Sequence, residues 1–489
     1  MRKSSVILAL LTCIHAVIAV GQVAAPSVPP RVFNALRDTL ATEYVNPIPK
    51  DSLTRFGTAQ DLLASLLDRH TLLFSPAERR EFEVETGQSF GGIGARLGVR
   101  RDTTVIVNVE PGSPAARARL RPFDRVVSIG GKPVAGLTPD SIIGLIRGPV
   151  GTKVRLGLRR GLARSTVEAT MVRGQVQVPS VPAGALLPSG VGVVKVAQFG
   201  PETTREAVEA LDWMVGNGAR AAILDLRDNP GGMLEEALGM AQLFLPAGSR
   251  LVEVRGRPGS GTQTARTGVA PRYPKLPLAV LINEGSASAS EVLAAALQDA
   301  GRATVAGRQS FGKGSVQHVA DLPGGWAVKL TIAKWYTPNG RGIDRGPQPS
   351  GVAIDPFAPH EGGVQPDLIL GPDSASALVA RAASAAGPAW DSLNLAILDW
   401  VEAASDTMTG LTQEFELDRA TARGIIDRTV PAGTVPPSAD SALVDWVQDA
   451  IGRGVVGGRF GVMEEGAWVL LHDPEVRRVA ERLKGDSLP

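Results

Sequence analysis

The sequence predicts an α/β core with a mostly parallel sheet, preceded by a small β-domain and flanked by helical regions. Three observations support this fold class. Strand-like and helix-like segments alternate over residues 175–372, which is the pattern of a parallel sheet covered by helices. Short β-rich runs separated by glycine turns occupy residues 89–174. Helical patterns dominate residues 26–88 and 373–489, so helical regions are expected at both ends.

The composition is that of an ordinary globular protein. The 489 residues are 44% hydrophobic and 20% charged, which excludes an intrinsically disordered chain. The formal net charge is +2, and no stripe of lysine and arginine is interleaved with aromatic residues. A nucleic-acid partner is therefore not expected.

Residues 1–25 have the pattern of a secretory signal peptide. Arg2 and Lys3 precede an apolar stretch at residues 6–20, and small residues follow it. An exported protein of the periplasm or cell envelope is expected, with an uncleaved membrane anchor as the alternative. Cys13 is the only cysteine and lies inside this segment, so the mature chain would contain none.

The helical N-terminal region carries two local signals. Leu62, Leu63, Leu66 and Leu67 are spaced to form one apolar helix face. The segment Ser75-Pro76-Ala77-Glu78 combines an N-cap serine, a proline in the first turn and an acid three residues after the serine. A second helix is therefore expected to begin there.

Ser288 is the candidate nucleophile. An apolar run, Leu276 to Ile282, enters a Gly/Ser turn that opens a helix expected over Ser286 to Ala300. A hydroxyl at such a strand-to-helix turn lies at the positive end of a helix dipole, where a negative oxygen is stabilised. The structural alternative is that Ser286, Ser288 and Ser290 only cap the helix.

Lys313 is the candidate base, 25 residues after Ser288 in the segment Phe311-Gly312-Lys313-Gly314. To accept a proton near pH 7–8, its pKa must fall by about 3 from the ~10.4 of a free lysine, which requires desolvation. On a regular strand, Lys313, Ser315 and Gln317 would share one face. The amide of Gln317 could then orient the amine without adding charge.

Two backbone elements are candidates for an oxyanion hole. The amide of Ala289 begins the helix, and Gly231 and Gly232 follow a predicted strand in a turn where backbone N–H groups can approach a ligand. Asp299, at the end of the same helix, is interpreted from the sequence as the partner of a lysine or a backbone amide.

Other catalytic motifs do not fit. Gly307-x4-Gly312-Lys313 resembles a phosphate-binding loop, but Gly314 stands where a Ser or Thr should follow. The sequence has no His-Glu-x-x-His motif and no usable cysteine, so no metal or other cofactor is expected. A Ser-His-Asp triad through His318 stays open as a minor alternative. The remaining histidines considered are scattered: His70, His360 and His472.

Taken in order, these motifs resemble the carboxy-terminal processing proteases, the S41 family of Ser/Lys peptidases with an inserted PDZ domain. The resemblance covers about residues 31–370. It rests on Ser89-Phe90-Gly91-Gly92-Ile93-Gly94, Gly112-Ser113-Pro114-Ala115, Leu145-Ile146-Arg147-Gly148, Asp228-Asn229-Pro230-Gly231-Gly232, the Ser288 turn, Phe311-Gly312-Lys313-Gly314 and Tyr336-Thr337-Pro338-Asn339-Gly340-Arg341.

The resemblance implies a crotonase-like protease core and assigns roles. Ser288 matches the nucleophile, Lys313 the general base and Gln317 the residue that aligns the lysine. Asp299 matches a supporting acid. The amide of Ala289 and one glycine of the pair Gly231 and Gly232 match the oxyanion hole.

The resemblance also implies that the PDZ domain captures a substrate's C-terminus and gates the active site. The matching loop is formed by Phe90, Gly91, Gly92, Ile93 and Gly94.

This sequence departs from the family pattern in three places. Arg119 and Phe123 stand where the family usually has glycine, the loop at residues 342–364 is long, and residues 373–489 have no counterpart.

The predicted function is that of an exported serine endopeptidase that cleaves proteins with apolar C-termini at or near those ends. The alternatives are an inactive PDZ-bearing binding protein and a cytosolic peptidase that keeps its N-terminus. A homo-oligomer and an adaptor lipoprotein are left open as partners.

Overall fold

The computed structural model describes ten stretches of the chain: residues 27–86, 89–100, 103–110, 112–160, 166–177, 179–346, 360–371, 374–407, 415–460 and 462–484. The expected signal segment and residues 347–359 of the long loop lie outside the described residues. Within the described stretches, no helix combines the length and apolar character needed to cross a membrane.

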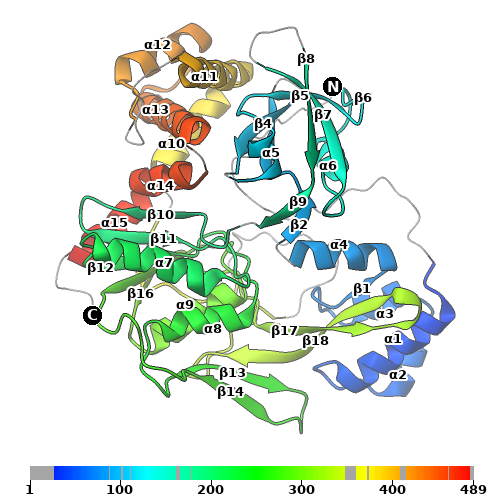
Figure 1. Ribbon diagram of the computed structural model, residues 1–489. Coiled ribbons are helices and arrows are strands. Elements are labelled where there is room, and N and C mark those ends of the chain that lie inside the picture. The colour runs from blue at the N-terminus through cyan, green and yellow to red at the C-terminus, as the bar shows by residue number, and fades with distance from the viewer. Residues whose placement is uncertain are drawn as a thin grey trace. The chain divides into compact units, whose positions relative to one another are not determined.

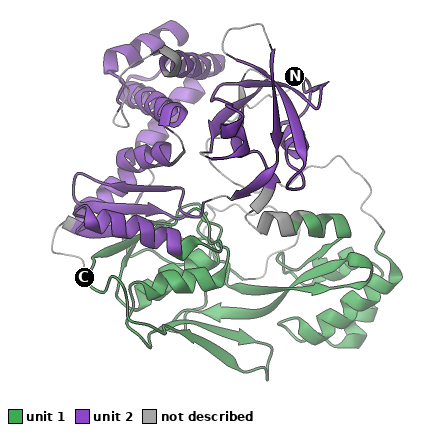
Figure 2. Ribbon diagram, viewed as in Figure 1, with its two compact units in different colours: residues 1–83, 197–204, 225–369 green, residues 84–196, 205–224, 370–489 purple. Residues whose placement is uncertain are grey.

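The chain forms two compact units, each built from several segments (Figure 2). Unit 1 comprises residues 1–83, 197–204 and 225–369, and unit 2 comprises residues 84–196, 205–224 and 370–489. An element that crosses a boundary belongs to the unit that holds most of its residues.

Unit 1 contains the N-terminal helices, two groups of strands and the helices between them (Figure 1). In chain order the elements are α1 (Pro30–Glu43), α2 (Lys50–Thr54), α3 (Ala59–Ser65), β1 (Leu72–Phe74), α4 (Pro76–Thr86), α8 (Leu234–Gln242), β13 (Arg250–Gly256), β14 (Thr262–Arg266), β15 (Leu278–Ile282), α9 (Ala289–Asp299), β16 (Thr304–Gly307), β17 (Ser315–Asp321), η1 (Pro323–Gly325), β18 (Ala327–Tyr336) and β19 (Leu368–Ile369).

The strands of unit 1 form an antiparallel group and a parallel group. The antiparallel order is β1-β18-β13-β14, with β17 also paired to β18 in a long hairpin. In the parallel group, β16 lies between β15 and β19. Every residue of β15 is buried, as expected for a strand covered on both faces. Strand β15 ends in the turn that precedes α9, and the β17–β18 hairpin follows β16 along the chain.

The N-terminal helices cover one face of this hairpin. Val32, Leu36 and Leu40 of α1 are fully buried in a cluster that also contains Val328 and Leu330 of β18. The i, i+4, i+8 spacing of the α1 residues places them on one side of that helix.

The expected four-leucine helix face is only partly correct. Leu62 and Leu63 lie in α3, but that helix ends at Ser65. Leu67 has φ +49° and is 49% exposed, because the chain turns there toward the short strand β1, which the sequence did not predict.

The predicted start of α4 is confirmed. The backbone N–H of Ser75 donates to Glu78 Oε2 (2.8 Å), and the N–H of Glu78 donates to Ser75 Oγ (3.4 Å). These two bonds form the reciprocal capping box expected from the Ser-Pro-Ala-Glu segment.

Unit 2 contains a β-domain, a short sheet segment with its covering helix, and six C-terminal helices among its described residues. In chain order the elements are β2 (Ser89–Gly92), β3 (Ala95–Arg100), β4 (Thr103–Val109), α5 (Pro114–Arg117), β5 (Arg125–Ile129), β6 (Lys132–Pro133), α6 (Pro139–Ile146), β7 (Lys153–Arg159), β8 (Thr166–Val172), β9 (Gly174–Gln177), β10 (Ala183–Leu186), β11 (Val191–Lys195), α7 (Thr203–Gly216), β12 (Ala221–Asp225), α10 (Ser374–Ala386), α11 (Pro388–Thr407), α12 (Arg419–Thr429), α13 (Pro437–Phe460), α14 (Val462–His472) and α15 (Pro474–Lys484).

The β-domain has the antiparallel order β3-β4-β5-β7-β8, with β6 paired to β5 and a separate pair β2-β9. Its core includes Ile106, Leu156 and Leu158, all at most 1% exposed. Arg119 and Phe123 have φ +58° and +67°, the left-handed conformation that glycine adopts most easily. The turn therefore keeps a glycine-like backbone without glycine.

The C-terminal helices pack on one another and on the β-domain. The rings of Trp390 in α11 and Trp446 in α13 stack with centroids 4.7 Å apart. Asn108 Nδ2 donates to the carbonyl of Gly457 in α13 (3.1 Å, buried). An α/β core, an inserted β-domain and helical ends are therefore all present, as the sequence predicted.

Candidate active site

Three serines surround the turn between β15 and α9, and two of them are structural. Ser286 Oγ donates to the carbonyl of Leu226 (2.8 Å), and Ser290 Oγ donates to the carbonyl of Asn229 (3.0 Å). Ser286 and Ser290 are 0% exposed. Ser288 is only partly buried, so it is the serine of this set whose side chain can meet a substrate.

The backbone at Ser288 is strained. Its φ of 56° and ψ of −115° lie outside the regions that L-residues favour, a conformation that costs on the order of 1–3 kcal/mol. Neighbouring bonds hold it, because the N–H of Ala287 donates to the carbonyl of Asn229 (2.9 Å). The helix begins at Ala289, three residues later than predicted, since residues 286–288 form this turn.

Gly231 and Gly232 are required by close backbone approach. A Cβ on Gly231 would lie 2.8 Å from Ser288 Cβ and 3.0 Å from the nitrogen of Ala289. A Cβ on Gly232 would lie 2.1 Å from the carbonyl oxygen of Phe199. The glycine turn therefore lies directly against the Ser288 turn.

The backbone N–H groups near Ser288 differ in whether they are free to donate to an oxyanion. The N–H of Gly231 donates to Asn229 Oδ1 (2.9 Å). Within the described stretches, no acceptor takes the N–H of Gly232 or of Ala289. The N–H of Gly232 is therefore available to an oxyanion, whereas that of Gly231 already has an acceptor. The sequence alone could not distinguish the two glycines in this way.

Glu291 connects the Ser288 turn to the Lys313 segment. Its Oε2 accepts the N–H of Ser288 (2.7 Å) and of Lys313 (2.8 Å). Its Oε1 accepts the hydroxyl of Ser310 (2.5 Å) and the N–H of Gly312 (2.6 Å). The side chain is 0% exposed, and burial raises its pKa while the four donors oppose that shift.

Sequence reasoning missed this role of Glu291. The available signal was a Ser-x-x-Glu capping box that begins at Ser288 and lies in a helix start filled with small and apolar residues.

Lys313 meets one requirement of a base. Burial lowers the pKa of its amine, while the nearby charge of Glu291 raises it. Its Nζ makes no hydrogen bond or ion pair to the part of the chain that the structure describes. The hydrogen bond between Lys313 and Ser288 that defines a dyad is therefore not formed in this conformation.

The expectation of a regular strand through Lys313 is wrong. β17 begins at Ser315, and its pairing with β18 shifts register between Val316 and Gln317. This bulge breaks the alternation of side chains. The amide Nε2 of Gln317 donates to Ser315 Oγ (2.7 Å).

Asp299 lies at the opposite end of α9 from Ser288, about 16 Å along an 11-residue helix. Its carboxylate is paired with Arg341 and accepts the N–H of Asn339 (2.8 Å). The structure does not bring Asp299 to Ser288, so any support that it gives the site is indirect.

His70 and Lys329 are near Lys313, and neither was predicted to be there. Burial, with a further contribution from the charge of Lys313, lowers the pKa of His70 to about 4 and that of Lys329 to about 8. His318 is exposed. The histidine beside the candidate base is therefore His70, because a turn brings it next to the β17–β18 hairpin.

The predicted peptide-binding loop lies in unit 2. Phe90, Gly91 and Gly92 belong to β2, which pairs with β9, and Ile93 is buried in the β-domain core. Gly94 has φ +68°, and a Cβ there would lie 2.3 Å from Ser113 Cβ.

Comparison with known proteins identifies the family. The model of peptidase family S41 matches residues 190–355, and a PDZ-domain model matches residues 105–160. The carboxyl-terminal-processing protease of Synechocystis sp. is 32% identical over 324 residues, which cover 65% of this chain and 75% of that protein. The chain belongs to peptidase family S41. It is a serine-type peptidase with a PDZ domain, in the group of carboxy-terminal processing proteases.

Other relatives match over similar lengths. The carboxy-terminal processing protease CtpA of Bacillus subtilis (strain 168) is 32% identical over 313 residues, which cover 64% of this chain and 66% of that protein. The chain thus spans slightly less than two thirds of that relative's length. A solved structure, a photosystem II D1 C-terminal processing protease, is 27% identical, with 70% of this chain and 93% of that chain covered and a TM-score of 0.43.

Proposed function

We propose that this protein is an exported endopeptidase that cleaves substrates at or near apolar C-termini with Ser288 as nucleophile and Lys313 as general base. The observation that carries the proposal is the arrangement around Glu291. This buried carboxylate holds the backbone of both residues, within 2.7 Å of the N–H of Ser288 and 2.8 Å of that of Lys313.

In the first half of the reaction, Ser288 Oγ adds to the scissile carbonyl as its proton passes to the neutral amine of Lys313. The tetrahedral oxyanion then accepts hydrogen bonds from the amides of Ala289 and Gly232. Loss of one such donor typically costs about 100-fold or more in rate. When the C–N bond breaks, the Lys313 ammonium protonates the departing amine and Ser288 is left as an acyl ester.

In the second half, water adds to the ester as Lys313 accepts its proton. The new tetrahedral intermediate collapses to release the carboxylic acid, and the proton of Lys313 returns to Ser288 Oγ. This sequence needs a neutral lysine, which burial favours. It also needs Lys313 Nζ within hydrogen-bond reach of Ser288 Oγ, a contact that often tightens only when substrate binds.

Capture of the substrate tail is assigned to the PDZ domain and its loop at residues 90–94. If that domain gates the reaction, a tail peptide added in trans changes the rate at which a second substrate is cleaved. Gln317 and Asp299 are proposed to act through Lys313 and the α9 segment respectively.

The test compares wild type with Ser288→Ala and Lys313→Ala on an unstructured protein with an apolar C-terminus. Cleavage by wild type, with both variants folded and inactive, supports the Ser/Lys mechanism. Activity that survives Lys313→Ala would place the base elsewhere, and His70 is then the first candidate because it lies beside Lys313. An inert wild type that a serine-directed covalent probe does not label would favour a binding protein.

A further inference from the structure

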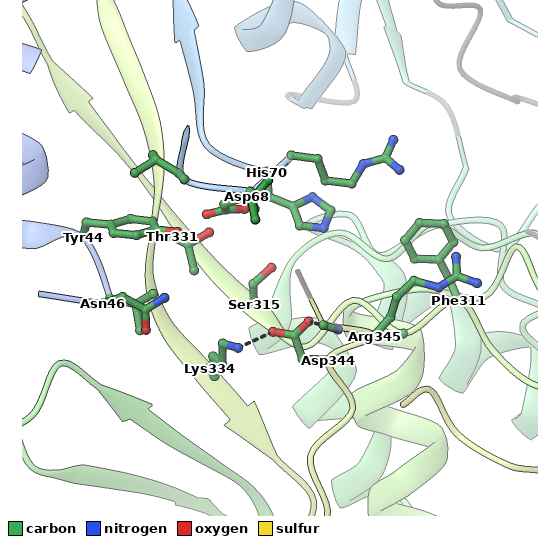
Figure 3. A pocket seen from close by; sticks show the side chains of 16 residues that line it. Tyr44, Asn46, Asp68, His70, Phe311, Ser315, Thr331, Lys334, Asp344 and Arg345 are labelled. Atoms are coloured by element: carbon green, nitrogen blue, oxygen red, sulfur yellow. Dashed lines mark hydrogen bonds and ion pairs between the residues drawn. The ribbon is translucent and has the colours of Figure 1, made fainter. Parts of the chain in front are cut away.

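A small pocket opens in unit 1 beside the segment that carries Lys313 (Figure 3). Gly312 and Ser315, which flank Lys313, form part of its wall, and Asp68 and His70 from the turn after α3 form another part. Its volume of about 80 Å³ suits a carboxylate or the end of a short side chain. No role in the proposed chemistry accounts for this pocket.

The acids of the pocket already have partners. Asp68 accepts hydrogen bonds from the hydroxyl of Thr71 (2.7 Å) and from the hydroxyl of Tyr44. Asp344 forms an ion pair with Lys334 (2.8 Å), which is drawn as a dashed line in Figure 3. The charge of Asp344 is therefore offset by Lys334, and Asp68 keeps its charge while its oxygens accept hydrogen bonds from neighbouring side chains.

The donors of the pocket are not all used. Thr331 is 2% exposed, and its Oγ1 has no hydrogen-bond partner among the described residues. Arg69 Nη1 is likewise buried and has no acceptor among the described residues. Buried polar groups in native structures normally have a partner, so these two atoms indicate a place for an acceptor.

The charge of the pocket has the sign that such an acceptor requires. Arg69, Lys334 and Arg345 line it, against the two carboxylates described above. The charge of Lys313 also acts on His70, which shows that the pocket and the candidate base share one electrostatic environment. An anion would gain charge-assisted hydrogen bonds here.

We propose that this pocket binds a carboxylate of the substrate segment that departs after cleavage, either its α-carboxylate or an Asp or Glu side chain. The inference rests on the proposed function. Lys313 protonates the departing amine, so the segment after the scissile bond leaves next to Lys313, and the pocket borders the segment that carries Lys313. Arg69 and Thr331 are the donors, and they would favour substrates with a carboxylate a short distance beyond the cut.

The test uses four peptides with one scissile site: a free acid, its C-terminal amide, and two amides with Glu or Gln in the departing segment. Wild type is expected to cleave a carboxylate-bearing peptide about tenfold or more faster, in kcat/KM, than its matched neutral peptide. Arg69→Gln and Thr331→Val should bring that ratio close to one, and Arg69→Lys should keep part of it. Arg250→Gln, an exposed arginine of β13, is the control and should keep the full ratio.

The two matched pairs separate the sources, because the acid–amide pair reports the α-carboxylate and the Glu–Gln pair reports a side chain. A preference that survives Arg69→Gln and Thr331→Val would belong to another site, such as the PDZ domain, and would overturn the proposal. Equal cleavage of all four peptides by wild type would also overturn it.

Failure of the catalytic proposal would be seen separately. If wild type cleaves none of the peptides, calorimetry with Ser288→Ala still measures binding of all four. The pocket then requires about tenfold tighter binding of the carboxylate-bearing peptide in at least one matched pair, and loss of that difference when Arg69→Gln is added. Equal binding within both matched pairs contradicts the pocket.

Discussion

Replacement of Glu291 by Gln is the sharpest test of how this site is held together. Each carboxylate oxygen accepts two donors, Ser310 O–H and Gly312 N–H at Oε1, and the N–H groups of Ser288 and Lys313 at Oε2. Glutamine is nearly the same size, but it places an NH₂ where one of these oxygens was. Donors then face donors in a fully buried space.

The magnitude follows from counting the donors that lose an acceptor. In the better orientation the NH₂ replaces Oε1, the Ser310 hydroxyl turns to accept it, and the N–H of Gly312 is the one backbone donor that is orphaned. One orphaned buried donor costs about 1–3 kcal/mol. In the other orientation the N–H groups of Ser288 and Lys313 are both orphaned, and the cost roughly doubles. We expect Glu291→Gln to lower the free energy of unfolding by about 1–3 kcal/mol, because the glutamine side chain adopts the better of the two orientations.

Activity should fall as well, since the same bonds position the Ser288 turn and the Lys313 segment. We expect a loss in kcat of up to about 100-fold, the scale of a misplacement near 1 Å. The charge of Glu291 raises the pKa of Lys313, so its removal should also move the acid limb of the kcat/KM profile to lower pH.

Urea unfolding with an unchanged m-value measures the stability change, and a pH series of kcat/KM measures the other two effects. Glu235→Gln is the matched control, because Glu235 is an exposed acid in the first turn of α8. If Glu291→Gln keeps wild-type stability, kcat and acid limb, the carboxylate does not position the site and the reasoning is refuted.

Three further outcomes are expected. Because burial depresses the pKa of Lys313, the folded state disfavours the charged amine that the unfolded chain carries at neutral pH. Lys313→Met should therefore be more stable than wild type at pH 7, and this gain should shrink as the pH approaches 10.5. The pKa of His70 is lowered from 6.5 to about 4, so its contribution of up to about 3 kcal/mol is present above pH 6.5 and is lost as the pH falls through 4; His70→Gln should flatten this part of a stability–pH curve. Arg119→Gly should raise the melting temperature, with a gain of up to about 1 kcal/mol from relief of the positive φ, whereas Phe123→Gly should lower it, because the ring packs against the C-terminal helices.

Each of these three predictions would be contradicted by a specific result. A pH-independent effect of Lys313→Met would show that the amine carries no buried charge. An unchanged slope between pH 6.5 and 4 in His70→Gln would assign the acid sensitivity to other groups. Destabilisation by Arg119→Gly would mean that the side chain of Arg119, and not its backbone, matters most.

Local signals in the sequence were reliable where neighbouring residues decide the structure. The Ser75–Glu78 capping box, the turn after Ile282 and the alternation of strands and helices depend on residues close together in the chain, and the structure contains them. The order of the Gly231, Ser288 and Lys313 motifs was likewise sufficient to indicate the peptidase family.

The sequence failed where a side chain's partner is distant in the chain. The pairing of β17 with β18 introduces the bulge that separates Lys313 from Gln317, and no local pattern signals it. For Asp299 the sequence left two interpretations open, and the structure shows the partner of a backbone amide, because its carboxylate pairs with Arg341 and accepts the N–H of Asn339. The sequence gives no sign that His70 lies near Lys313, because 243 residues separate the two.

The sequence by itself determined the fold class and the identity of the candidate nucleophile and base, because those follow from local periodicity and from the chemistry of ordered motifs. Only the tertiary structure decided which serine is accessible, which glycine amide is available, and that Glu291 joins the two halves of the site. Burial and hydrogen-bond partners are set by segments that meet only after folding. That is also why the pocket beside Lys313, built from the N-terminal turn and the β18 strand, has no signature in the sequence.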